Sequence, residues 1–365
     1  MLKVELKVPQ RVTAPIRVIQ WATGAMGKTC LRSVIDHPDL ELVGLYVYSA
    51  SKEGQDAGDI ARRAPTGVKA TRKIEDILAL DADVVLHCPL LQFPYSAHDD
   101  DVCRLLASGK NVISINNYFH SASLGATHAA RFEESCRVGK STLCGTGINP
   151  GFIAERIAAV ASGLCVELES IECREVYDCI DMPNANYVFG VMGMGSAPEK
   201  IDLKTGQFAL LFNDMYRQTV GSLAERLDFP LDRVEPDHRL VLAPHDITAR
   251  AGVIKAGTVA ATCWQFHGVV AGKRVVTLSV NWTMGKAVPG YETFNHWNIS
   301  IRGKPGIDIT MDLIEAQDTQ VKTRAAQYGV AGAVINAIPH VIAAPPGLFR
   351  FSLPPVFSKR LLSDA

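Results

Sequence analysis

Six small or apolar residues near the N-terminus have the spacing of a phosphate-binding turn: Ala22, Thr23, Gly24, Ala25, Met26 and Gly27. They keep the G-x-G-x-x-G spacing, with alanine in the first place. Such residues allow a tight turn, a close approach of the backbone to a pyrophosphate, and close packing of the next helix on the strand. The free N–H groups at the start of that helix attract phosphate. We interpret the segment as part of a dinucleotide site, the alternative being a purely structural turn.

The residues that follow the second expected strand bear on the choice of nicotinamide cofactor. A carboxylate there accepts a hydrogen bond from the ribose 2′-OH and repels a 2′-phosphate. This chain has none at that point, and Ser49, Ser51 and Lys52 supply two hydroxyl groups and an ammonium instead. The sequence therefore predicts that NADP(H) is preferred. If these are ordinary polar loop residues, NAD(H) is possible as well.

An alternation of strands and helices must position these groups. Short apolar strands are expected at residues 17–21, 41–48, 83–88, 111–115 and 141–144, with helices at 25–36, 99–108 and 123–138. This order is typical of a parallel sheet, whose ligands bind beyond the carboxyl ends of the strands. The loops after Cys88, Ile115 and Cys144 should then converge on the nicotinamide. Cys88, Pro89 and Asn149 therefore join the cofactor candidates.

The pattern changes near residue 165. Strands now follow one another, at 166–177, 257–270, 273–282, 296–302 and 307–311, and turns at 271–273 and 303–306 predict hairpins. Helices are expected at 205–227, 312–328 and 331–344. The chain is therefore predicted to be an α/β protein with three parts. These are an N-terminal Rossmann domain with a parallel sheet (1–150), a substrate-binding and dimerisation α+β domain with an open, largely antiparallel sheet (151–312), and C-terminal helices and tail packing back on the first domain (313–365).

Composition favours an enzyme over an interaction module. At 365 residues the chain can bury a sizeable core, and a net charge of −1 gives no electrostatic case for nucleic acid or an anionic membrane. No apolar run reaches transmembrane length, and no signal-peptide core is visible. The 9 cysteines contain no C-x-x-C pair, which suggests neither disulfides nor a metal site. We expect a cytoplasmic protein that binds a small molecule and neither nucleic acid nor membrane.

Three motifs in order resemble those of the 2,4-diaminopentanoate dehydrogenase and native amine dehydrogenase family, relatives of dihydrodipicolinate reductase. They are residues 22–27, the segment Gly-Thr-Gly-Ile-Asn-Pro-Gly-Phe at 145–152, and Asn-Ala-Ile-Pro at 336–339 with Ala-Pro-Pro-Gly at 344–347. The resemblance covers nearly the whole chain. It implies a Rossmann domain, a second α/β domain with an open sheet, NAD(P)H as hydride donor, and a homodimer. The implied reaction is the reversible reductive amination of a ketone or a related C=O or C=N reduction.

One departure from that family concerns chemistry. Its members carry a glutamate just after the strand that here is 111–115, where this chain has Asn116 and Asn117. Asparagine can orient a carbonyl or an ammonium but cannot exchange a proton near neutral pH. We predict the reduction of a ketone, aldehyde or imine, with Asn117 or Asn116 orienting the substrate, and a gain of reductive amination in Asn117→Glu. A true amine dehydrogenase, a non-catalytic NADP(H)-binding protein, and an asparagine that only accommodates an unusual backbone angle are the alternatives.

Without the glutamate, water or another acid must deliver a proton to the reduced atom. The candidates are Tyr118 and His120 in the same loop, and Glu175, Tyr177 and Asp178 at the end of the first strand of the second domain.

The expected substrate follows from the side chains of the second domain. This domain is rich in aromatic and methionine side chains, among which we select Tyr187, Met192 and Trp264 as substrate contacts. No arginine lies among them to bind a carboxylate. Tyr187 and Met192, in a glycine-rich loop, are expected to be exposed to the ligand. We predict a small, neutral, hydrophobic ketone, aldehyde, imine or amine.

Overall fold

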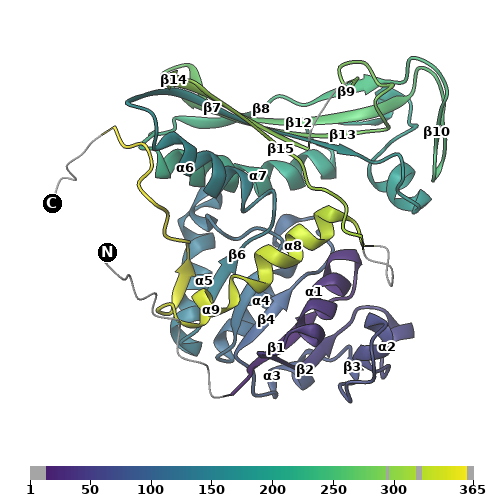
Figure 1. Ribbon diagram of the computed structural model, residues 1–365, viewed down its shortest axis with the longest axis vertical. Coiled ribbons are helices and arrows are strands. Elements are labelled where there is room, and N and C mark those ends of the chain that lie inside the picture. The colour runs from purple at the N-terminus through teal and green to yellow at the C-terminus, as the bar shows by residue number, and fades with distance from the viewer. Residues whose placement is uncertain (1–13, 293–295, 318–322, 360–365) are drawn as a thin grey trace, which may run out of the picture.

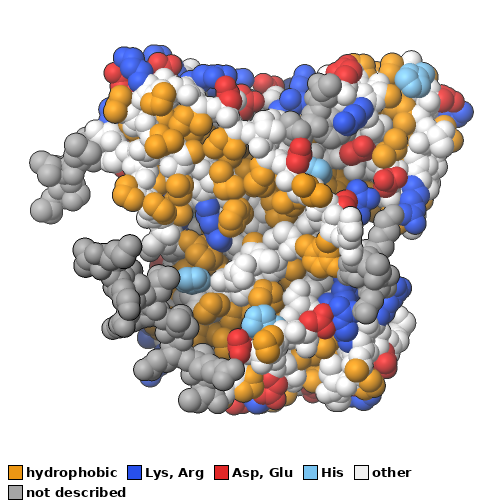
Figure 2. Space-filling model, in the orientation of Figure 1, with side chains coloured by type: hydrophobic (Ala, Val, Ile, Leu, Met, Phe, Trp, Pro, Cys, Tyr) orange, Lys and Arg blue, Asp and Glu red, His pale blue; other side chains and the backbone are white. Residues whose placement is uncertain are grey.

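Two sheets with helices between them form the molecule (Figure 1), described by a computed structural model for residues 14–292, 296–317 and 323–359. On the face shown in Figure 2, hydrophobic side chains are concentrated between the two sheets, while charged side chains lie mainly at the outer edges. None of the helices in the described part of the chain has the length and apolar character needed to cross a bilayer.

The first sheet is parallel throughout and has the strand order β16-β6-β5-β4-β1-β2-β3. Its strands are β1 (Ile16–Trp21), β2 (Leu40–Tyr46), β3 (Ala70–Thr71), β4 (Val84–His87), β5 (Asn111–Ser114), β6 (Thr142–Gly145) and β16 (Gly347–Phe349). Its helices are α1 (Ala25–Asp36), α2 (Ala57–Ala61), α3 (Ile74–Leu78), α4 (Asp99–Ala107) and α5 (Ala126–Gly139). The predicted Rossmann sheet is confirmed, and its C-terminal edge strand β16 was not predicted.

The C-terminal helices α8 (Ala325–Ile335) and α9 (Ile338–Ile342) cover one face of this sheet. Ala331, Val334 and Val341 share a core with Val18 and Val34, and α8 packs against α1. The helix expected at 312–328 is wrong over 312–317 and 323–324, and its residues 318–322 lie outside the described part of the chain. The side chain of Asp312 accepts the backbone N–H of His296 at 2.8 Å. That bond holds residue 312 beside the sheet, and a tertiary contact overrides the local helix pattern.

The second sheet is antiparallel except where β7 and β13 run parallel, and its order is β15-β14-β7-β13-β12-β8, with β9 also paired to β12. Its strands are β7 (Glu167–Asp178), β8 (Arg233–Pro236), β9 (Arg239–Leu242), β12 (Val259–Val270), β13 (Lys273–Thr283), β14 (Trp297–Lys304) and β15 (Ile307–Met311). A separate hairpin contains β10 (Ile247–Ala249) and β11 (Gly252–Ile254). The largely antiparallel sheet is confirmed. Ala271 and Gly272, with φ of 48° and 78°, form the predicted hairpin turn.

The helix α7 (Gln207–Arg226) covers the face of this sheet that is turned toward the first domain (Figure 1). On that face the strand register places Trp297, Glu175, Val280 and Trp264 in one row across β14, β7, β13 and β12. Side chains alternate between the two faces of a strand, so Cys173 and Tyr177 lie on the same face as Glu175. A carboxylate therefore stands in a row of apolar and aromatic residues.

Candidate active site

The two glycines of the turn between β1 and α1 differ in whether the fold leaves room for a side chain. A Cβ on Gly27 would lie 2.3 Å from the carbonyl oxygen of Ala22, so glycine is needed for the helix to pack on the strand. A Cβ on Gly24 would have nothing within 4 Å, and the φ of −67° at this residue suits any amino acid. The apo fold thus has no steric need for Gly24. The open space before the first turn of α1 fits the pyrophosphate of a dinucleotide.

The loop after β2 places a cation beside this turn. The ammonium of Lys52 donates to the hydroxyl and the carbonyl oxygen of Thr23 at 2.8 and 3.1 Å. The hydroxyl groups of Ser49 and Ser51 are exposed and 2.8 Å apart. Burial and, after it, the nearby charge of Lys28 lower the pKa of Lys52. Among the described residues neither lysine has a carboxylate partner, so a positive charge is available here.

The loops after β4 and β6 lie at the same edge of the sheet. Cys88 and Pro89 are buried, and the Sγ atoms of Cys88 and Cys30 are 3.9 Å apart. Asn149 does not cap the following helix. Its Nδ2 donates to Oε2 of Glu175 at 2.9 Å, while its Oδ1 is buried without a partner among the described residues. The cofactor-side loop therefore reaches directly to the second sheet.

Glu175 is partly buried at this contact. Its Oε2 also accepts the indole N–H of Trp297 at 2.8 Å. Burial raises the pKa of the Glu175 carboxyl, and the hydrogen bonds from Asn149 and Trp297 oppose that rise. The sequence offered Glu175 only as one of five acids. Trp297 was missed, because a contact across 122 positions leaves no local signal.

The two asparagines in the loop after β5 make structural contacts. Asn117 has a φ of 82°, its side chain is buried, and its Nδ2 donates to the carbonyl oxygen of Met215 in α7 at 2.5 Å. The carbonyl oxygen of Asn116 accepts the hydroxyl of Tyr95 at 2.8 Å. Oδ1 of Asn117 and Nδ2 of Asn116 are buried without partners among the described residues. This geometry favours the backbone explanation for Asn117, since asparagine tolerates the left-handed region. It gives no support to the predicted gain in Asn117→Glu.

The remaining acids are held elsewhere. Tyr118 donates to Asp99 inside the first domain at 3.0 Å, and Asp178 accepts the backbone N–H groups of Ile180 and Gly285, each at 3.0 Å. Tyr177 is partly buried, and burial raises the pKa of its hydroxyl. Of the three, only Tyr177 lies on the same sheet face as Glu175.

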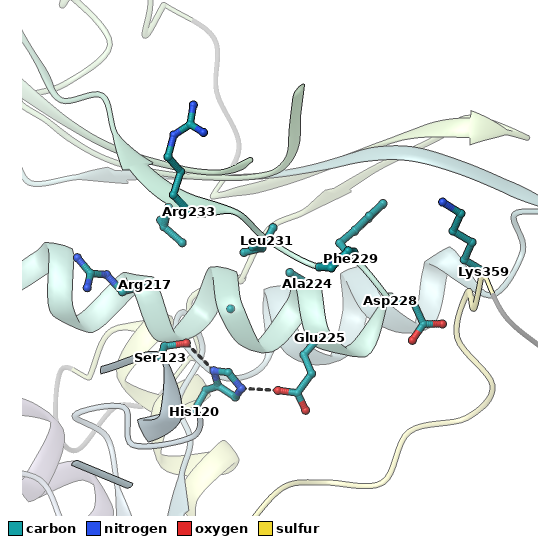
Figure 3. Close-up of a pocket in the computed structure, with 13 residues that line it drawn as sticks. His120, Ser123, Arg217, Ala224, Glu225, Asp228, Phe229, Leu231, Arg233 and Lys359 are labelled. Carbon is teal, nitrogen blue, oxygen red and sulfur yellow. Dashed lines mark hydrogen bonds and ion pairs between the residues drawn. The ribbon is translucent and has the colours of Figure 1, made fainter. Parts of the chain in front are cut away.

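His120 lines a separate groove of about 1070 Å³ along α7 (Figure 3). The imidazole lies between the hydroxyl of Ser123, at 2.5 Å, and the carboxylate of Glu225. None of the residues that line the groove belongs to the loops that contain Gly24, Cys88 or Asn149. His120 is therefore placed away from the expected nicotinamide position.

The three substrate candidates lie in different surroundings. Trp264 is 3% exposed and packs edge-on against Phe212 of α7, with its Nε1 buried without a partner among the described residues. Tyr187 is partly buried in a helical turn over residues 186–191. Met192 is 5% exposed and belongs to a small core beside β10 and β11, so the expectation that it is exposed is wrong. The loop folds onto its own apolar side chains, because exposing them to water is unfavourable.

Comparison with known proteins agrees with this architecture. Residues 152–360 match the 2,4-diaminopentanoate dehydrogenase C-terminal domain, and residues 18–88 match the N-terminus of dihydrodipicolinate reductase. The chain is 27% identical to an amine dehydrogenase of Streptomyces virginiae, over 92% of this chain and 94% of that protein. It is 22% identical to the 2,4-diaminopentanoate dehydrogenase of Acetoanaerobium sticklandii, over 91% of both proteins.

A solved structure also has the same fold. The amine dehydrogenase from Mycobacterium smegmatis superimposes with a TM-score of 0.72 at 17% identity, over 92% of this chain and 95% of the other. The C-terminal match alone spans more than half of the sequence. The chain therefore belongs to the 2,4-diaminopentanoate dehydrogenase and amine dehydrogenase family, and it is an NAD(P)-dependent oxidoreductase.

Proposed function

We propose that this enzyme uses NADPH to reduce the C=O or C=N group of a small hydrophobic ketone, aldehyde or imine. The observation that carries the proposal is the contact between Asn149, in the loop after β6, and Glu175, in the apolar row of the second sheet. It brings the carboxyl edge of the dinucleotide-binding sheet against a wall of aromatic and aliphatic side chains. Ligands of open α/β sheets bind at that edge.

The chain offers suitable groups for the cofactor. The N–H groups at the start of α1 and the space beside Gly24 would hold the pyrophosphate, and Ser49, Ser51 and Lys52 would hold the 2′-phosphate. The unpartnered Oδ1 of Asn149 is a suitable acceptor for an amide N–H. When bound, the nicotinamide supplies the hydride.

The substrate side is apolar. Trp264, Val280 and Trp297 flank Glu175 on the sheet face, and no lysine or arginine among the described residues forms an ion pair with that carboxylate. A hydrocarbon chain would be removed from water against these side chains. This supports a neutral, hydrophobic substrate. Named relatives are dehydrogenases of an amine and of 2,4-diaminopentanoate, which supports an amine as the product.

The test is NADPH oxidation with a panel of cyclic and linear ketones and aldehydes, with and without ammonium, with product analysis. We expect turnover with at least one hydrophobic carbonyl and a lower Kd for NADPH than for NADH. Equal affinity for both cofactors would contradict the 2′-phosphate assignment, and NADPH binding with no turnover on any substrate would contradict the reaction. We also propose a homodimer, as the family resemblance implies, to be tested by light scattering after size-exclusion chromatography.

A further inference from the structure

We propose that Glu175, on the face of the second sheet that is turned toward the first domain, exchanges protons with the reacting oxygen or nitrogen of the substrate. The inference rests on the proposed function. It assigns a catalytic residue to a strand of the second domain, whereas Asn116 and Asn117 in the loop after β5 have amide side chains that cannot exchange a proton near neutral pH.

The first observation is that the packing of the sheet gives no reason for an acidic residue at position 175. Its neighbours across the sheet are Trp297 on β14 and Val280 on β13, and the row continues to Trp264 on β12. Removing a carboxylate from water beside such side chains is unfavourable unless its oxygens are well paired. A strand that needed only to fill the row would have an apolar residue at position 175. Ionisable groups retained in such places are frequently catalytic.

The second observation is that hydrogen bonds from the protein hold one oxygen of the carboxyl group and not the other. Asn149 and Trp297 both donate to Oε2, at 2.9 and 2.8 Å. No hydrogen bond in the described part of the chain uses Oε1. The residue as a whole is only partly buried. Two donors on one oxygen orient the carboxyl plane and leave the other oxygen for a substrate.

The third observation concerns charge. The titratable groups that interact electrostatically with Glu175 are Tyr177 on β7, Cys179 directly after that strand, Tyr216 on α7, and His296 next to β14. No lysine or arginine among the described residues forms a salt bridge with it. The charge of Glu175 is therefore not neutralised by the protein. A proton or a protonated substrate nitrogen can neutralise it, and these are the two partners that carbonyl reduction and amination require.

The chemistry can be written so that it balances. In carbonyl reduction a hydride forms the new C–H bond, the C=O π pair moves to oxygen, and the Glu175 proton forms the O–H bond. The carboxylate then regains a proton from solvent. In amination the carboxylate takes a proton from ammonium, and the nitrogen lone pair forms the C–N bond. One more nitrogen proton moves to the former carbonyl oxygen, and the Glu175 proton joins it as this oxygen leaves as water, so that an iminium remains for reduction.

The experiment compares Glu175→Gln with Glu172→Gln, a control on the exposed face of the same strand. We expect Glu175→Gln to lower kcat by about 100-fold or more, the usual contribution of a general acid or base. The Kd for NADPH, measured by calorimetry, should change less than twofold in both variants. In carbonyl reduction the rate should fall as rising pH deprotonates Glu175. This fall should be absent from the pH–rate profile of Glu175→Gln and present in that of Glu172→Gln. A Glu175→Gln variant with wild-type kcat and pH profile overturns the inference and leaves the proposed function intact.

A second measurement distinguishes failure of the proposed function from failure of the inference about Glu175. If the wild-type enzyme binds NADPH but reduces none of the carbonyl compounds, the proposed function fails. The binding of cyclohexylamine to the NADP⁺-loaded protein then tests Glu175 without turnover. Affinity about tenfold lower in Glu175→Gln than in Glu172→Gln supports the pairing with nitrogen, and equal affinity overturns it. Should Glu175→Gln not fold, Glu175→Asp, which keeps the carboxyl group and shortens its reach, serves in the kcat and amine-binding assays with the same criteria. Its own carboxyl still titrates, so the pH–rate profile is not a criterion for this variant.

Discussion

Replacing Gly24 by valine should weaken NADPH binding by about 100-fold and leave the fold intact. The backbone at residue 24 has a φ of −67° and a ψ of −168°, which valine adopts readily, and an added Cβ would meet nothing within 4 Å. The expected cost to stability is about 1 kcal/mol, because valine is a poorer N-cap than glycine. In a chain of this length, such a change lowers Tm by about 2 °C or less.

The expected effect on binding is much larger. The branched side chain would fill the space in which the pyrophosphate approaches the N-terminus of α1. Each lost hydrogen bond from a backbone N–H to a charged phosphate is worth about 1.5–3 kcal/mol. The loss of one or two such bonds corresponds to an NADPH affinity about 100-fold lower. Calorimetry with NADPH, together with thermal unfolding of the apo protein, measures both quantities.

Gly27→Ala is the matched control. Its Cβ would lie 2.3 Å from the carbonyl oxygen of Ala22, so α1 must move away from β1. Overpacking of this kind costs about 1–3 kcal/mol, and the loss should be visible in the apo protein as a lower Tm. Normal NADPH binding by Gly24→Val would refute the phosphate assignment, and an unchanged Tm in Gly27→Ala would refute the packing argument.

Substitutions at three further positions test other parts of the site. Lys52→Ala should narrow the preference for NADPH over NADH by about 1 kcal/mol, about fivefold, and an unchanged ratio of the two Kd values would place the 2′-phosphate elsewhere. Asn117→Ala should lower the free energy of unfolding by about 2–3 kcal/mol in urea, since it strains the backbone and removes the hydrogen bond from Nδ2 to the carbonyl oxygen of Met215, and Asn117→Gly should recover about 1 kcal/mol of this. Equal stability of the two would contradict the backbone explanation. Trp297→Phe removes a hydrogen-bond donor that favours the charged form of Glu175, so the pKa of Glu175 should rise. The fall in the rate of carbonyl reduction with rising pH should then occur about one pH unit higher. A fall at an unchanged or lower pH would show that another group titrates.

The dinucleotide turn and the hairpins could be predicted because their determinants are contiguous. The steric demand at Gly27 is set by Ala22, five positions earlier, and the positive φ values at Ala271 and Gly272 belong to adjacent residues. Hydrophobic periodicity likewise predicted the parallel and antiparallel sheets, since it reflects which face of each strand is buried. Where a distant contact decided the local structure, the sequence failed. Asp312 is held by His296, and β16 joins the first sheet beside β6 although about 200 residues separate them.

The chemical site depended on tertiary structure to a greater extent. The sequence alone shows small residues with the spacing of a dinucleotide turn after β1, a lysine in the loop after β2, and two asparagines in the loop after β5. It could not rank five candidate acids, because each is compatible with its own neighbours in the chain. Glu175 stands out only once strand register sets it beside Trp297 and the loop after β6 brings Asn149 to it, across 122 and 26 positions. The surroundings of a side chain, which set its pKa and its access to ligand, come from segments that are distant in sequence and are brought together only when the two sheets pack.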